Sequence, residues 1–277
     1  MFWAALEKRK TRLMETAENA VFIFCAKLTN TVKSGKIGWY GGKMLEEFYN
    51  TIFNLIYPAR CGFCNEITGT NSFICDNCKY RLKQEYANRC MYCGKVTLLR
   101  DICSECKDKK IYYDKLVFFN EYTKEFREKI HSYKFRDKKF YYNFFEELIY
   151  DKLCDTEADI IIPVPVSSQR LKDRGYNQSA LIGEKLAKDM KIEYSGEILT
   201  KVRNSEKQSM QNFHERQESV KNIFQIADIL GIRGKRVILI DDVFATGATA
   251  NECSKELTKA GAKSVVVAVI SISHTLK

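Results

Sequence analysis

Four Cys-x-x-Cys pairs between residues 61 and 106 constrain the fold of this chain more than any other feature of its sequence. Each such turn directs two thiolates at one point, and two turns complete a tetrahedral site of four sulfurs. Thiolates are soft ligands that suit zinc, an ion that imposes no geometry of its own. The segment is therefore predicted to fold around two structural zinc ions. The ligands in chain order are Cys61, Cys64, Cys75, Cys78, Cys90, Cys93, Cys103 and Cys106.

The sequence does not decide which turns share a metal ion or which metal is bound. Sequential pairing is the simplest, with the first four cysteines around one ion and the last four around the second, but an interleaved pairing stays open. An iron–sulfur cluster uses the same four-sulfur ligation and also stays open. A redox-active dithiol does not explain four regularly spaced pairs. Asn65 and Gly94 each follow the second cysteine of a pair, and both tolerate the positive φ that helps a backbone wrap a metal.

Length and composition place limits on the class of protein. The 277 residues suffice for one large domain and a small one. No secretory signal is recognisable, and no uncharged run near the N-terminus reaches the roughly 20 residues that a membrane-spanning helix needs. We therefore expect a cytoplasmic protein without a membrane span, whose eleven cysteines stay reduced. The net charge of +10 favours anionic partners without selecting among them.

Downstream of the cysteines, short apolar runs alternate with helical patterns. Strands are expected over residues 115–120, 159–163, 235–240 and 264–270, and helices around residues 126–133, 140–153, 178–190 and 250–259. This alternation predicts an α/β fold with a mostly parallel sheet and helices on both faces. Residues 1–57 have a helical pattern that Pro58 ends, and residues 200–222 are polar and expected to form a long loop with some helix.

Two carboxylates follow the apolar run Val237 to Ile240. They are Asp241 and Asp242, and the small and hydroxyl residues Ala245, Thr246, Gly247, Ala248 and Thr249 come soon after them. Side chains at the carboxyl end of a parallel strand open onto the crevice where ligands bind. Two acids there can accept hydrogen bonds from adjacent sugar hydroxyls. The free N–H groups and the dipole of a following helix attract an anion, so this stretch predicts a site for a phosphorylated ribose.

This stretch resembles the phosphoribosyl diphosphate signature of type I phosphoribosyltransferases, and further motifs resemble the competence protein F (ComFC-like) family. Those motifs are Pro163-Val164-Pro165-Val166, Arg174-Gly175-Tyr176-Asn177-Gln178, His131-Ser132-Tyr133-Lys134-Phe135, and Gln208 with Arg216 and Asn222 ahead of Phe224. Members of that family carry cysteine ribbons before a phosphoribosyltransferase domain. The resemblance covers roughly residues 50–275 and implies a double zinc ribbon over 58–110 and a type I phosphoribosyltransferase-like domain over 111–277. The helical pattern over 1–57 is then an N-terminal extension, and residues 1–45 lie outside the resemblance.

Carried over position by position, the family pattern implies roles for the residues of the site. Asp241 and Asp242 would contact the ribose, and residues 245–249 the 5′-phosphate. Diphosphate contacts would come from the loop that contains Val164, Pro165 and Val166, with Lys134 and Arg174 as cationic candidates. Mg²⁺ would be held mainly by oxygens of the ligand itself. Residues 203–216 would form a mobile hood over the site.

One position departs from the family pattern. Ala245 stands where the family usually has Thr, and in oxopurine-salvage relatives an acid at the equivalent place serves as the base. An oxopurine transferase is therefore disfavoured. No general base is found elsewhere, because His131, His214 and His274 are scattered, and single histidines are more often structural or solvated. If the site is catalytic, the reaction is displacement at the anomeric carbon of the ribose, with diphosphate leaving.

Three functions stay open at this point. The resemblance implies an accessory protein of DNA uptake in natural transformation, with a competence helicase as partner and single-stranded DNA as a further candidate. The chain could instead be an active phosphoribosyltransferase of nucleotide metabolism, or a ligand sensor that has lost catalysis. The lack of a base favours the first or the third. The sequence does not identify the acceptor, the oligomeric state or the role of residues 1–45.

Overall fold

The structure is a computed structural model, and it describes residues 58–68, 72–82, 88–98, 102–135, 141–202 and 223–273. The helical pattern expected over residues 1–57 and the hood expected over residues 203–216 lie outside these ranges. The chain divides into two compact units, Met1–Pro58 and Ala59–Lys277, and every element described below belongs to the second.

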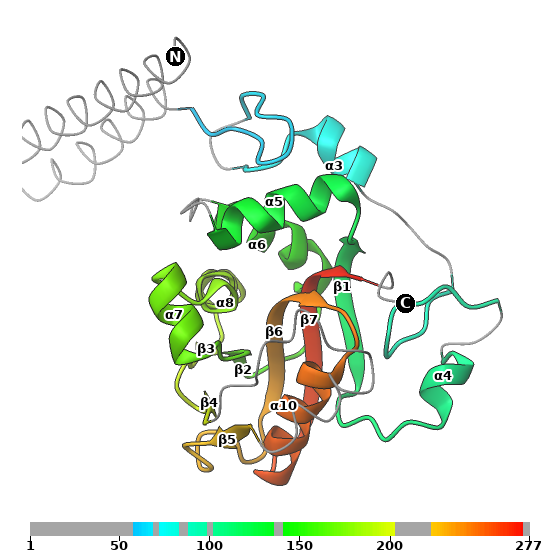
Figure 1. The fold of residues 1–277 in the computed structure, drawn as a ribbon, viewed down its shortest axis with the longest axis vertical. Coiled ribbons are helices and arrows are strands. Elements are labelled where there is room, and N and C mark those ends of the chain that lie inside the picture. Colours follow the sequence, from blue (N-terminus) through cyan, green and yellow to red (C-terminus); the bar gives the residue numbers. More distant parts are fainter. Residues whose placement is uncertain are drawn as a thin grey trace, which may run out of the picture. The chain divides into compact units, whose positions relative to one another are not determined.

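A five-stranded parallel sheet is the centre of this second unit (Figure 1). Its order is β1-β7-β6-β2-β3, and each neighbouring pair is parallel. The strands are β1 Lys115–Glu121, β2 Ile160–Pro163, β3 Glu193–Tyr194, β6 Arg236–Phe244 and β7 Ser264–Ile272. The predicted parallel α/β sheet is thus confirmed. The central strands consist of continuous aliphatic runs because both of their faces are covered.

Strand β6 continues further than the sequence indicated. We expected it to end at Ile240, but its pairing with β7 continues through Asp241 opposite Val269 and Phe244 opposite Ile272. The two carboxylates therefore lie within the last residues of the strand rather than after it. A separate two-stranded antiparallel sheet pairs β4 Leu199–Lys201 with β5 Phe224–Ile226. It was not predicted, and neither was the two-residue β3.

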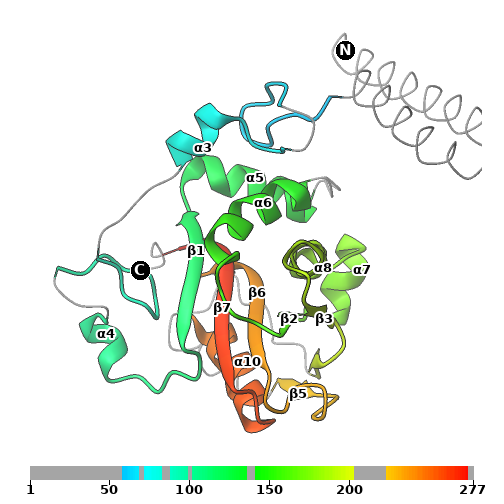
Figure 2. The same ribbon diagram turned by 180° about the vertical axis from the view of Figure 1, so that it is seen from behind.

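Helices cover both faces of the sheet, as Figures 1 and 2 show. The larger helices are α5 Lys124–Phe135, α6 Tyr141–Leu153, α8 Gln178–Met190 and α10 Ala248–Lys259, with the shorter α7 Ser168–Arg174 before α8. Alternate residues of β6 face opposite sides: Ile238 and Ile240 pack with α5, α6 and α8, whereas Val237 and Leu239 pack with α10. No helix in the described ranges combines the length and the hydropathy that spanning a bilayer requires.

Two small cysteine ribbons pack on this α/β body. The first ribbon comprises the described residues 58–68 and 72–82 with α3 Asp76–Leu82, and the second comprises 88–98 and 102–110 with α4 Ser104–Lys107. The first joins the hydrophobic cluster of α5, α6 and α8, while Tyr92 and Cys93 of the second join the cluster of α10. The two ribbons therefore belong to the hydrophobic cores on opposite faces of one sheet.

Candidate functional site

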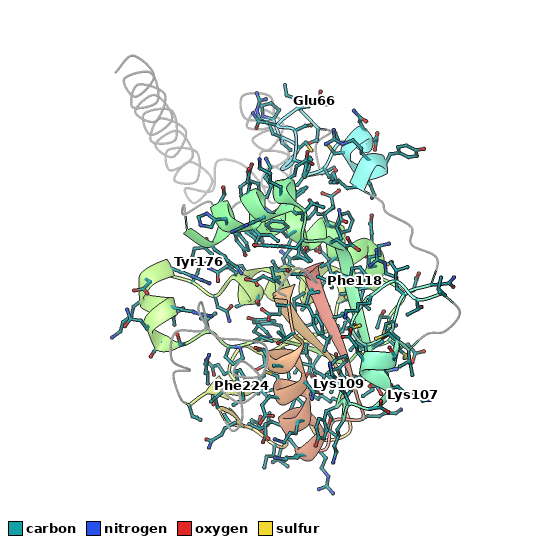
Figure 3. The ribbon with its side chains drawn as sticks, turned by 45° about the vertical axis from the view of Figure 1, so that its right-hand side comes forward. Glu66, Lys107, Lys109, Phe118, Tyr176 and Phe224 are labelled. Atoms are coloured by element: carbon teal, nitrogen blue, oxygen red, sulfur yellow. The ribbon has the colours of Figure 1, made fainter. Side chains whose placement is uncertain are left out.

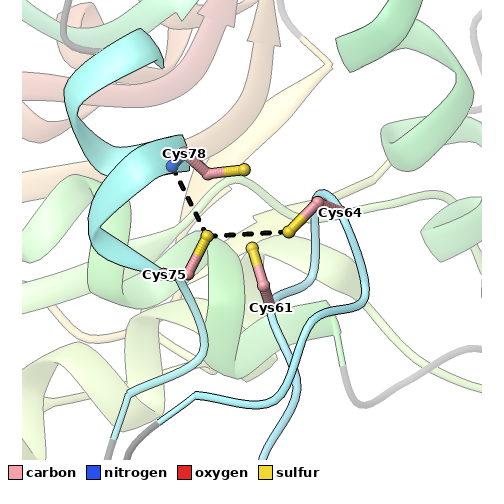
Figure 4. A group of neighbouring side chains, drawn as sticks. All are labelled: Cys61, Cys64, Cys75 and Cys78. Carbon is pink, nitrogen blue, oxygen red and sulfur yellow. Dashed lines mark hydrogen bonds between the residues drawn. The ribbon is translucent and has the colours of Figure 1, made fainter.

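The eight cysteines form two separate groups of four. The groups are Cys61, Cys64, Cys75 and Cys78, shown in Figure 4, and Cys90, Cys93, Cys103 and Cys106. Within each group the sulfur atoms lie within 4.8 Å of one another, which confirms the sequential pairing. The Sγ atoms of Cys64 and Cys75 are 3.6 Å apart, as are those of Cys93 and Cys103. Four thiolates at Zn–S distances of about 2.3 Å would be separated by about 3.8 Å, so the geometry fits zinc.

The two ribbons repeat one local structure. In each, the carbonyl of the first cysteine accepts a 2.8 Å hydrogen bond from the residue after the second, Asn65 in one case and Gly94 in the other. These two residues have φ values of 67° and 73°, as their sequence positions predicted. The preceding arginines also correspond, since Arg60 donates to the carbonyl of Asn65 and Arg89 to that of Gly94. Burial raises the pKa of Cys93 to about 12, and a bound cation would favour its thiolate.

A cleft of about 460 Å³ lies at the carboxyl end of β6. We call it the strand-end cleft. It brings together every residue that the sequence assigned to the phosphoribosyl ligand. These are Lys134, Val164, Pro165, Arg174, Asp241, Asp242, Ala245, Thr246, Gly247, Ala248 and Thr249. They come from α5, from the loop after β2, from α7, from the end of β6, and from the turn into α10 with the first residues of that helix, so parts of the chain far apart in sequence meet at one place.

Hydrogen bonds join the motifs that surround the strand-end cleft. The Tyr133 hydroxyl donates to the Gln178 carbonyl at 2.8 Å, and the Tyr176 hydroxyl donates to the Tyr133 carbonyl. The rings of Tyr133 and Tyr176 lie 5.9 Å apart. The Asn177 side-chain amide donates to the Val164 carbonyl at 3.0 Å. These contacts fix the end of α5, the turn before α8 and the loop after β2 against one another, and this holds Lys134 and Arg174 at the cleft.

The two carboxylates have different surroundings. Asp241 accepts hydrogen bonds from the Ser179 hydroxyl at 3.1 Å and from the Asp242 backbone N–H at 2.8 Å. Burial, together with the negative charge of Asp242, raises the pKa of Asp241 to about 7. Asp242 instead forms an ion pair with Lys134, with Nζ and Oδ2 2.7 Å apart. A ribose hydroxyl that binds Asp242 would therefore either share this carboxylate with Lys134 or displace Lys134 from it. The sequence did not reveal this ion pair.

The connection from β6 to α10 has the form of an anion site. Gly247 precedes the helix with a φ of 77°, and as the N-cap residue it has no side chain to cap the helix. The first N–H groups of a helix lack partners within the helix, and residues 245–249, which surround this helix start, line the strand-end cleft. The Thr246 hydroxyl accepts from the Ala248 N–H at 3.3 Å. Phe244 lies directly beneath Gly247, because a Cβ atom on Gly247 would be 2.5 Å from the Phe244 Cζ atom.

Sequence reasoning missed several residues of the strand-end cleft. Arg170 and Lys201 line it, as do Tyr122, Ser179 and Phe224. Burial lowers the pKa of Lys201, whose Nζ lies 5.7 Å from the centre of the Phe224 ring. The available signal was the position of Lys201 two residues before residues 203–216, which we expected to cover the site. With Lys134 and Arg174 the lining holds four Lys or Arg side chains against two Asp, an excess of positive charge that suits phosphates.

Comparisons with known proteins identify two domains. A model of the double zinc ribbon domain matches residues 52–110, and a model of the phosphoribosyl transferase domain matches residues 177–273. The chain is 28% identical over 221 residues to competence protein F of Haemophilus influenzae, across 76% of this chain and 96% of that protein. It is 28% identical over 197 residues to competence protein ComFC of Bacillus subtilis, across 68% and 79% of the two chains.

The chain is also similar to a DNA utilization protein and to a solved phosphoribosyltransferase structure. The chain is 24% identical over 214 residues to DNA utilization protein YhgH of Escherichia coli K12, across 75% of this chain and 87% of that protein. Among solved structures, it is similar to adenine phosphoribosyltransferase from Thermoanaerobacter pseudethanolicus, with a TM-score of 0.33 and 17% identity across 50% of this chain and 83% of that chain.

Proposed function

Because this chain belongs to the competence protein F family, with a double zinc ribbon ahead of a phosphoribosyltransferase domain, we propose that it binds phosphoribosyl diphosphate in the strand-end cleft and acts in DNA uptake. One observation carries the proposal. The strand-end acids, the start of α10 and four cationic side chains line a single cleft.

Each part of phosphoribosyl diphosphate has a chemical counterpart in this cleft. The ribose hydroxyls are donors, and the carboxylates of Asp241 and Asp242 are acceptors at the end of β6. The 5′-phosphate suits the N–H groups at the start of α10, where the helix dipole also favours an anion. The diphosphate suits Lys134 and Arg174, and Mg²⁺ held by the ligand's own oxygens would reduce its charge.

The same proposal gives the protein a place in DNA uptake. Its relatives are named as competence and DNA utilization proteins. We propose that it works in the cytoplasm with a competence helicase, and that single-stranded DNA is a ligand of the complex. A strain that lacks the protein should lose transformation, and an Asp241→Asn/Asp242→Asn variant should fail to restore it. Full restoration by this variant would separate the cleft from DNA uptake.

Calorimetric titration with phosphoribosyl diphosphate and Mg²⁺ tests the binding directly. A hydrogen bond to a charged group contributes about 1.5–3 kcal/mol and one to a neutral group about 0.5–1.5 kcal/mol. Replacing both carboxylates by amides should therefore lose about 1 kcal/mol or more at each position and weaken binding by at least about tenfold. The single variant Asp241→Asn should also weaken it, and it leaves the Lys134–Asp242 ion pair in place. Asp155→Asn changes an exposed acid outside the cleft and serves as the control. A wild-type protein that does not bind the ligand would refute the proposal.

A further inference from the structure

Of the two cysteine ribbons, the second contacts the residues that shape the 5′-phosphate turn (residues 245–249). We propose that the metal site of the second ribbon positions this turn, and that Tyr113 is the positioning residue between them. The inference rests on the proposed binding of phosphoribosyl diphosphate. None of the described residues of the second ribbon lines the strand-end cleft, so this ribbon would affect the affinity for the ligand without touching it.

Tyr113 is tied to the metal site of the second ribbon by a hydrogen bond and by its ring. Its hydroxyl donates to the carbonyl of Tyr92 at 2.7 Å, and Tyr92 lies between the ligands Cys90 and Cys93. The rings of Tyr92 and Tyr113 meet edge to face, with their centres 6.0 Å apart. Tyr113 is only 6% exposed. A change in the path of the Cys90–Cys93 turn would therefore move the Tyr113 side chain, because the hydrogen bond and the ring contact join it to Tyr92.

Tyr113 in turn packs against the residue beneath the phosphate turn. Its ring meets that of Phe244 edge to face, with the centres 6.5 Å apart and the planes at 85°. Phe244 is also only 6% exposed, and its Cζ atom would lie 2.5 Å from a Cβ atom on Gly247. We infer that the Phe244 ring sets the position of the phosphate turn, and that the edge-to-face contact with Tyr113 helps to fix this ring.

A second route from the same ribbon leads to the same place. A Cβ atom on Gly94 would lie 2.7 Å from Cδ1 of Ile272 and 2.8 Å from Cε1 of Phe118, the β1 residue labelled in Figure 3. Ile272 is the strand partner of Phe244 in the pairing of β7 with β6. The turn that holds the second metal site therefore touches both the side-chain neighbour and the strand neighbour of Phe244.

The first ribbon has the same local structure but different contacts. A Cβ atom on Gly62 would lie 2.5 Å from Cγ of Phe144 on α6, and the Phe63 ring lies 5.9 Å from that of Phe126 on α5. The backbone N–H of Phe73 donates to Glu147 of α6 at 2.6 Å. These contacts belong to the opposite face of the sheet. The first ribbon is thus an internal control for the second.

Matched removal of one ligand from each site tests the inference. Cys93→Ser and Cys64→Ser should each retain one zinc ion per chain, with circular dichroism like that of the wild type. Cys93→Ser should weaken the binding of phosphoribosyl diphosphate by about fivefold or more, within the usual range of coupling between sites, whereas Cys64→Ser should change it by less than about twofold. Equal affinities in the two variants would overturn the inference.

Variants of Tyr113 test its role with both zinc ions in place. Tyr113→Leu should retain two zinc ions and bind phosphoribosyl diphosphate about fivefold or more weakly. Tyr113→Phe keeps the ring on Phe244 but loses the hydrogen bond to the Tyr92 carbonyl, so its affinity should lie between those of the wild type and Tyr113→Leu. A role in core packing alone would lower the melting temperature of Tyr113→Leu and leave its affinity unchanged, and that result would refute the positioning role.

Thermodynamic reciprocity gives a third measurement that needs no catalytic activity. In Cys64→Ser, the remaining zinc ion occupies the second site. Saturating phosphoribosyl diphosphate should raise the affinity of this site for zinc, and the factor should equal the one by which bound zinc raises the affinity for phosphoribosyl diphosphate. A zinc affinity that is the same with and without phosphoribosyl diphosphate would contradict the inference. If the wild type does not bind phosphoribosyl diphosphate at all, the proposed function fails first; if it binds but none of these variants differs, only the inference fails.

Discussion

Substitution of Gly247 by Ala should separate backbone strain from displacement of the phosphate turn. A φ of 77° costs an L residue about 1–2 kcal/mol. The new Cβ atom would also lie 2.5 Å from Cζ of Phe244, whereas carbon atoms pack best at about 3.5–4.0 Å. Either the ring or the turn must therefore move by about 1 Å. Because the Phe244 ring is buried and packs against Tyr113, overpacking should add about 1–3 kcal/mol.

Gly234→Ala is the matched control for this substitution. Gly234 has a φ of 75°, close to that of Gly247, but a Cβ atom there would meet nothing within 4 Å. It also precedes the same strand, at the end far from the cleft. Gly234→Ala should therefore incur only the backbone cost, and the two variants should differ in unfolding free energy by about 1–3 kcal/mol.

Urea unfolding and ligand titration measure the two consequences. The extra cost should appear as a lower urea midpoint and as a melting temperature lower by roughly 2–12 °C, at about 2–4 °C per kcal/mol for a domain of this size. Gly247→Ala should also bind phosphoribosyl diphosphate more weakly than Gly234→Ala. Equal stability of the two variants, or wild-type affinity in Gly247→Ala, would show that Phe244 does not set the position of the turn.

Three further predictions concern charged groups. Because burial and Asp242 raise the pKa of Asp241 to about 7, the affinity for phosphoribosyl diphosphate should increase as the pH rises through 7, and calorimetry should find a weaker pH dependence in Asp241→Asn. Burial also raises the pKa of Glu146 from 4.5 to about 7, so its contribution to stability is present below pH 4.5 and is lost as the pH rises to about 7. Glu146→Gln should therefore gain stability relative to the wild type between these pH values in urea unfolding, and a constant difference would count against this reasoning. Lys134→Met should weaken phosphoribosyl diphosphate more than ribose 5-phosphate, because Lys134 is assigned to the diphosphate; equal losses in two titrations would instead place it near the 5′-phosphate.

Much of the sheet and its helices followed from local patterns. The helix predicted over 178–190 has these bounds as α8, because Asn177 caps its start and Ile182 and Leu186 repeat at helical spacing on its buried side. The two-residue β3 and the three-residue β4 and β5 could not be predicted, since a run that short shows no period. The end of β6 was misplaced because pairing with β7 outweighs the low strand preference of Asp.

Some residues of the strand-end cleft could be predicted from the sequence, and others could not. Asp241 and residues 245–249 were found because their order along the chain carries the chemistry. Ser179 and Lys201 were missed because only the fold brings them to the cleft. The Lys134–Asp242 ion pair also depends on the tertiary structure, since α5 must first be fixed by the hydrogen bonds of Tyr133. Contacts of this kind have no signature in a single sequence.

The position of the second ribbon beside β1 has a consequence for solubility. β1 is an edge strand, and the ribbon covers part of that edge, because Leu116 donates its N–H to the Met91 carbonyl at 2.7 Å and Arg89 pairs with Glu121 at 2.9 Å. Uncovered edge strands recruit strands from other chains. We therefore expect that loss of the ion of the second ribbon would uncover part of this edge and favour self-association at high protein concentration.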